Sequence, residues 1–228
     1  MNEKVNVTSV SRRLAAFISG VLALWVAVGS PLAALDHELL TFHMLQHLLL
    51  MTVAAPLLLI GTPEIILRHR LSRWLPVRIV THPVFGWLAG TFAVVGWHIP
   101  AFFALGMRSN AWHEIEQAWF LAAGLLFWLP VVRPGSYVAG RPWSIPLYLF
   151  LATLPCDALS AFLAFCDRVV YPHYLSVRRL VDISPLADQE LAGALMWVWV
   201  TFAYLGPAVV FIIRMLSPQR LDVREKAV

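Results

Sequence analysis

The stretch FHMLQHLLLMTVAAPLLLIGTP, Phe42–Pro63, decides the interpretation of this sequence. It is uncharged, and as a helix it is long enough to cross the ~30 Å hydrocarbon core of a bilayer. Yet it carries His43 and His47 one helical turn apart, and Met51 a further turn along the same helix face. Because ionisable side chains are costly in hydrocarbon, histidines in such a segment indicate a functional site.

The composition of the whole chain agrees with a membrane protein. Only 13% of the 228 residues are charged, against about 25% in soluble domains, and 60% are hydrophobic. We predict an all-α, polytopic membrane bundle of about six transmembrane helices that forms a single domain over residues 1–228. The expected spans are approximately 14–35, 39–60, 84–105, 112–132, 145–165 and 191–215.

The first span needs a separate decision, because Arg12 and Arg13 precede its apolar run as they would in a signal peptide. Its apolar part is about 20 residues, longer than the roughly 7–15 of a signal peptide core. We therefore expect a retained helix. Within the spans, prolines are expected to bend or open the helices; they are Pro56, Pro100, Pro155 and Pro207.

Basic residues predict the orientation. If the N-terminus is cytoplasmic, thirteen of the 17 Lys and Arg residues lie in inner segments, and the outer loops hold four. This bias predicts that both termini are cytoplasmic. It also accounts for the net charge of +4 without a nucleic-acid partner. Six of the eight histidines then fall on the outer side: His37, His43, His47, His98, His113 and His173.

The donor types favour copper. Imidazole and thioether groups both suit Cu(I), and imidazole also suits Cu(II) and zinc. His98 and His113 would join the pair on the second span from the next two spans, with Met51 as an auxiliary ligand. Glu116, one turn after His113, would orient an imidazole by hydrogen bonding.

Other polar residues of the outer half are less directly implicated. Asp157, beside Pro155, would pair with a histidine or stay protonated. His37 and His173 are interpreted as solvated loop residues. The alternatives for the histidine group are hydrogen bonds between helices in a metal-free scaffold for oxidase subunits, or haem b ligation with His47 and His98 as axial ligands. The sequence contains no P-loop or Rossmann glycine pattern, so nucleotide-driven work is not expected.

Several motifs in order resemble one known family. HMLQHLLLM and APLLLIGTP in the second span are similar to the signature of the CtaG family of cytochrome c oxidase assembly factors. WHIPAFF (97–103) and HEIEQAWFLAAGLLFW (113–128) continue the resemblance, followed by FCDRVVYPHY (165–174) and SPLADQELAGALMW (184–197). Together they cover roughly residues 14–215.

The resemblance implies a multi-pass protein of the bacterial inner membrane, not an enzyme, that is needed to make active haem–copper oxidase and handles or delivers copper. Its partners would be oxidase subunits, the lipid bilayer and periplasmic copper chaperones, and no nucleic acid. The family histidines fall on His43, His47, His98 and His113. The remaining family positions are Asp167, Arg168 and Tyr171 of the outer loop and the pair Asp188 and Gln189.

Asp188 and Glu116 are expected to orient the imidazoles, with Gln189 beside them. Cys156–Asp157 stand where the family tends to have asparagine, and the sequence begins with what resembles the family's second span.

Overall fold

The computed structural model describes residues 7–63, 82–133, 141–178 and 181–217. These ranges are helical and contain no strand. Five helices are long and apolar enough to cross a membrane, or six if one bent pair is counted as a span. The prediction of an all-α membrane bundle is therefore confirmed. Most of the basic residues behind the predicted orientation lie outside the described ranges.

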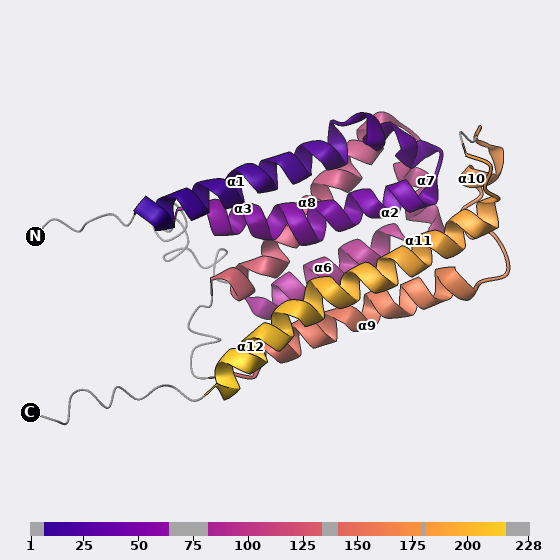
Figure 1. The fold of residues 1–228 in the computed structure, drawn as a ribbon. Coiled ribbons are helices and arrows are strands. Elements are labelled where there is room, and N and C mark those ends of the chain that lie inside the picture. The colour runs from indigo at the N-terminus through magenta and orange to yellow at the C-terminus, as the bar shows by residue number, and fades with distance from the viewer. Residues whose placement is uncertain (1–6, 64–81, 134–140, 179–180, 218–228) are drawn as a thin grey trace, which may run out of the picture.

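The first half of the chain forms two packed spans (Figure 1). Helix α1 (Val7–Val28) packs against α3 (Ala55–Gly61). The predicted end of the first span at residue 35 is wrong. Helix α1 ends just before Gly29, Ser30 and Pro31. A proline disfavours helical dihedrals at the residue before it, which here is Ser30. A 3₁₀ segment, η1 (Pro31–His37), then turns the chain back into the bundle.

The second span is one continuous rod in three parts: α2 (Leu40–Leu48), the π-helical segment η2 (Leu49–Ala54) and α3. Pro56 lies just after the π segment. A proline ring clashes with the carbonyl four residues earlier in a regular helix, and the wider π turn relieves this clash. The last span has the same combination of a π segment followed by a proline. There α11 (Pro185–Val200) leads into the π segment η3 (Thr201–Leu205), and Pro207 follows in α12 (Gly206–Leu216).

The span predicted over residues 84–105 is broken at Pro100, one of the prolines predicted to bend or open a helix. Helices α6 (Pro83–Trp97) and α7 (Pro100–Gly106) meet at an angle of 84°. Pro100 causes the break, since Ile99 before it is extended. The bend places His98 at the end of α6, inside the bundle rather than along a straight rod.

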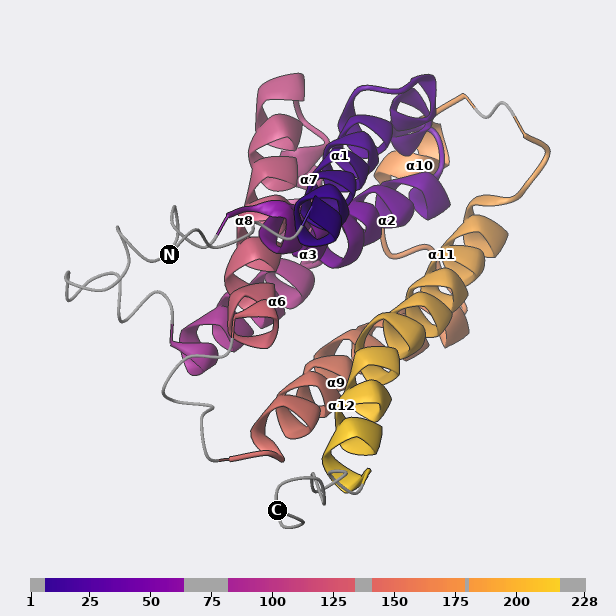
Figure 2. The same cartoon turned by 60° about the vertical axis from the view of Figure 1, so that its left-hand side comes forward.

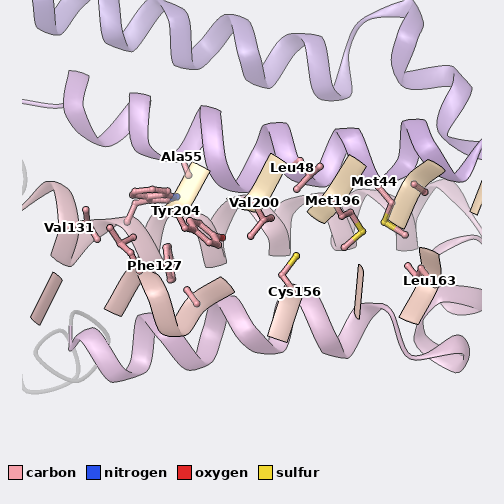
Figure 3. Close-up of a cluster of buried hydrophobic side chains, with 14 of the residues drawn as sticks. Met44, Leu48, Ala55, Phe127, Val131, Cys156, Leu163, Met196, Val200 and Tyr204 are labelled. Atoms are coloured by element: carbon pink, nitrogen blue, oxygen red, sulfur yellow. The ribbon is translucent and has the colours of Figure 1, made fainter. Parts of the chain in front are cut away.

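The remaining helices complete the bundle. They are α8 (Asn110–Val132), α9 (Ser144–Phe165) and the short α10 (His173–Ser176). Helix α6 packs against α8, and α9 against α11, as the view in Figure 2 also shows. The buried apolar core lies between these layers (Figure 3), whereas large apolar side chains remain exposed on the outside, among them Phe92, Leu147 and Phe202. Such an apolar exterior is what a lipid-facing surface requires.

Close helix contact at Gly86 gives a stability prediction. A Cβ there would lie 2.5 Å from the backbone oxygen of Leu126 in α8, which has no flexible end to move aside. Gly86→Ala should therefore force α6 and α8 apart and cost about 1–3 kcal/mol of unfolding free energy. The matched control is Gly206→Ala, because a Cβ at Gly206 meets nothing within 4 Å. Thermal unfolding in detergent should show a lower midpoint for the first variant only; equal midpoints would contradict the packing.

Candidate metal centre

The helix that carries the histidine pair is held at both ends by other helices. Leu39, which precedes α2, offers no side-chain cap. Instead the Asp188 carboxylate of α11 accepts hydrogen bonds from Leu40 N–H (2.8 Å) and Thr41 N–H (3.1 Å). At the π segment, the Met51 carbonyl accepts from Trp128 Nε1 at 3.0 Å. The backbone of α2 is therefore fixed between α11 and α8.

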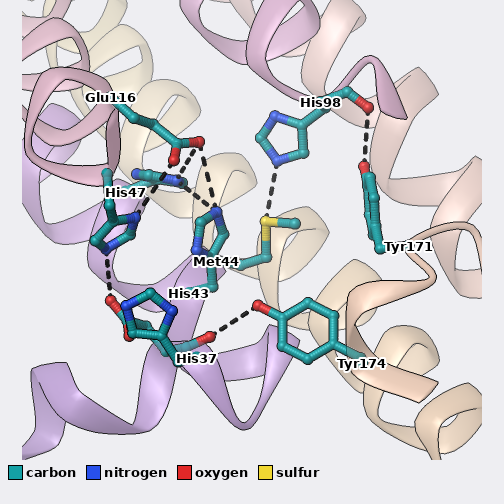
Figure 4. Close-up of polar contacts among 10 residues, drawn as sticks. His37, His43, Met44, His47, His98, Glu116, Tyr171 and Tyr174 are labelled. Carbon is teal, nitrogen blue, oxygen red and sulfur yellow. Dashed lines mark hydrogen bonds and ion pairs between the residues drawn. The ribbon is translucent and has the colours of Figure 1, made fainter. Parts of the chain in front are cut away.

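The centre of the site is a buried triad from two helices (Figure 4). The Nε2 atoms of His43 and His47 lie 2.8 Å apart. Oε1 of Glu116, from α8, lies 3.3 Å from His47 Nε2 and 3.6 Å from His43 Nε2. The three residues are at most 3% exposed, and one potential ligand atom from each lies within 4.8 Å of the others. Two imidazoles and a carboxylate converge here inside an apolar bundle.

The Glu116 carboxylate lies where it does because α7 leaves room for it. Gly106 faces Glu116 so closely that a Cβ on this glycine would overlap Oε2. The same oxygen lies 3.4 Å from His113 Nδ1, one turn earlier in α8. Glu116 thus contacts three histidines. Glu116 was predicted to orient an imidazole by hydrogen bonding, and its carboxylate lies where it could also bind a metal ion directly.

His98 approaches the triad from the broken span. Its Nε2 lies 3.0 Å from Met44 Sδ, and its ring centroid lies 6.3 Å from that of His47. The helix break frees the His98 carbonyl, which accepts a hydrogen bond from the Tyr171 hydroxyl at 3.0 Å. His98 therefore stands beside the triad and is paired with the thioether of Met44, which lies one residue off the predicted stripe and leans into the same space.

Met51 does not share the contacts of the two histidines before it. The π segment interrupts the straight-helix stripe, and the Met51 side chain packs toward Gly90 and Phe127. It lines a pocket together with His47 and His98. Phe120 stacks on the His47 ring with centroids 3.8 Å apart, so an aromatic side chain covers one face of a proposed axial ligand.

A second cluster lies at the end of the bundle formed by η1 and α10, and the sequence did not predict it. His113 Nε2 lies 2.6 Å from Oδ2 of Asp36, and His37 Nε2 lies 3.7 Å from Oδ1. Burial of Asp36 raises the pKa of its carboxyl, but the bond to His113 outweighs burial and holds that pKa below its ordinary value. His37 keeps a 41% exposed side chain, in line with its interpretation as a solvated loop residue. His173 is partly buried, and its Nε2 lies 3.1 Å from the His37 carbonyl oxygen.

Comparison with known proteins gives the family of the chain. The family of the cytochrome c oxidase caa3 assembly factor (Caa3_CtaG) matches residues 3–217. The chain belongs to this family. It is also similar to two uncharacterized proteins, one of Mycobacterium bovis and one of Mycobacterium tuberculosis, each 24% identical over 205 residues. These matches cover 81% of this chain and 31% of each relative, so the chain spans about a third of their length. No solved structure matches.

Asp188, Gln189 and Asp157 come from α11 and α9, not from the helices that carry the inner triad. Asp188 accepts hydrogen bonds from the first N–H groups of α2, so it positions His43 through the backbone, and its expected role in orienting an imidazole stays a prediction. Gln189 accepts from Val170 N–H at 2.7 Å and donates to the carbonyls of Leu163 and Arg168, so it fastens the outer loop. Asp157 is partly exposed on α9, and its role stays a prediction.

Proposed function

We propose that this assembly factor binds copper reversibly at His43, His47 and Glu116 during the maturation of cytochrome c oxidase, with no catalytic turnover. The observation that carries the proposal is the convergence of two imidazole nitrogens and a carboxylate oxygen within 4.8 Å in the bundle interior. A buried carboxylate is costly unless it is paired or coordinates a metal. Glu116 Oε2 has no hydrogen-bond partner among the described residues, which is consistent with a coordinating role.

The donor set also suggests how copper is released. Two imidazoles and a carboxylate suit Cu(II), whereas the thioether of Met44 beside His98 adds a soft donor that favours Cu(I). A carrier needs a site that holds its cargo without trapping it. Neighbouring donors of different softness allow an ion to change partners in small steps. His98 and Met44 therefore extend the primary triad as the next donors on the route.

The proposal includes a location and partners. We place the chain as a multi-pass protein of the bacterial inner membrane with both termini cytoplasmic, so the histidines lie toward the periplasm. The oxidase subunit that receives copper and a periplasmic copper chaperone that supplies it are the proposed partners. Haem ligation is the less favoured alternative, because Phe120 stacks on the His47 ring with centroids 3.8 Å apart.

The test is a paired measurement of binding and rescue. The detergent-purified chain should retain copper after dialysis and show no Soret band. The same chain, expressed in a host that lacks its own assembly factor, should restore oxidase activity together with oxidase copper content. Restored oxidase without copper binding by the purified chain would replace this proposal with the metal-free scaffold, and a Soret band would support haem instead.

A further inference from the structure

We propose a second metal-binding site at the outer end of the bundle, formed by Asp36, His37 and His113, which captures a divalent copper ion before it reaches the inner triad. The proposal rests on the proposed function for its purpose, but its geometry is independent. One ligand atom from each of the three residues lies within 4.8 Å of the others. They come from two separate parts of the fold, η1 and α8.

The donor set of the outer site is that of a cation site. Two imidazoles and one carboxylate are typical ligands for Cu(II) or zinc. The Asp36 residue is 2% exposed, and its Oδ1 has no hydrogen-bond partner among the residues described. A simple ion pair with His113 uses only Oδ2. The second oxygen, directed to the side where His37 Nε2 lies at 3.7 Å, is left for a further ligand.

Access distinguishes the outer site from the inner one. The residues of the inner triad are at most 3% exposed, so an ion cannot reach them directly from water. The His37 side chain is 41% exposed while its neighbour Asp36 is buried. An ion could therefore first meet His37 at the surface and then exchange water for the two buried donors.

The surroundings hold the outer site in a fixed shape. The Tyr174 hydroxyl donates to the Asp36 carbonyl at 2.8 Å, and His173 contacts the His37 carbonyl. These contacts fasten the backbone of η1 to α10 but leave the ligand atoms of the site available. A preorganised ligand set binds a metal more tightly because less motion is lost on binding.

The two sites are linked by the imidazole of His113. His113 faces Asp36 through Nε2 and Glu116 through Nδ1, and its ring centroid lies 5.6 Å from that of His43. An ion that leaves the outer ligands therefore needs to pass only this ring to meet Glu116. The sequence of donors runs from a half-exposed histidine to a fully buried pair.

The experiment counts ions in the full-length, detergent-purified chain. Metal-free protein is dialysed against Cu(II) at neutral pH, and bound copper is measured together with its electron paramagnetic resonance spectrum. Wild type should bind two ions. His37→Ala and Asp36→Asn should each weaken one of them by at least about tenfold while the other stays. The matched control is His173→Ala, which alters the same corner without removing a proposed ligand.

The outcomes separate this inference from the proposed function. If His37→Ala and Asp36→Asn bind as wild type does, or if His173→Ala loses the same ion, the outer site is overturned. If the outer variants lose an ion but His43→Ala with His47→Ala changes nothing, the outer site stands and the inner one fails. Asp36→Asn keeps the side-chain volume, so an effect on binding with an unchanged unfolding midpoint reports ligation rather than misfolding.

Discussion

The double variant His43→Ala/His47→Ala should lose the ion of the inner triad, with an affinity at that site at least about a hundredfold below wild type, while the ion of the outer site stays. Removing a residue that merely orients a ligand typically costs 10–100-fold. The double variant removes two of the three converging donors at once. The Glu116 oxygen that lies 3.3 Å from His47 Nε2 in wild type is then left without an imidazole from α2. Copper retained after dialysis, per purified chain, measures the effect. Rescue of oxidase activity should fall in parallel.

Folding has to be controlled in this experiment, because breaking up a buried charged group destabilises a protein by roughly 3–5 kcal/mol. The variant His43→Gln/His47→Gln keeps side-chain bulk and hydrogen-bonding capacity while it removes both imidazoles. It should fold and still lose the ion of the inner triad. His82→Ala, at the start of α6, removes a histidine that the inner triad does not include. If the glutamine variant retains wild-type copper affinity, the histidines of α2 are not ligands.

The histidine group was predictable because the membrane makes it conspicuous. Hydrocarbon excludes polar side chains so strongly that His43 and His47 stood out in an apolar run, and helical periodicity placed them on one face. Antiparallel neighbours then placed His98 at a depth similar to that of His47, with His113 at the top of the following span. The structure brings all four into one region through α2, α6 and α8, with His47 and His98 centroids 6.3 Å apart.

The details that fix the chemistry were not predictable, because each depends on residues distant in the chain. Asp36 reaches His113 only because Pro31 ends α1 early and η1 folds inward, across 77 residues of sequence. Asp188 caps α2 although it lies 148 residues away in the sequence from Leu40. No sequence pattern around Leu39 indicates a cap supplied by another helix. Met51 was assigned to the stripe by counting regular turns, and a π segment changes that count.

Gly106→Ala should lower copper affinity by about 10–100-fold although it adds only a methyl group and touches no histidine. Its Cβ would overlap Oε2 of Glu116, and the flexible carboxylate is the part that can move. Alanine is favoured over glycine within a helix such as α7, so the fold should be retained. The displaced carboxylate would leave His43 and His47 without their oxygen partner. Ala104→Val, on an exposed position of the same helix, is the control and should bind copper normally.

A double-mutant cycle decides whether Gly106 acts through Glu116. Glu116→Gln keeps the size of the side chain and removes its charge, so it should weaken copper binding on its own. Residues that act through one contact are not additive, whereas independent sites add within about 0.3–0.5 kcal/mol. Gly106→Ala/Glu116→Gln should therefore bind no more weakly than Glu116→Gln alone. Full additivity would mean that the methyl group disturbs the site by another route, and that the space beside Gly106 does not set the position of the carboxylate.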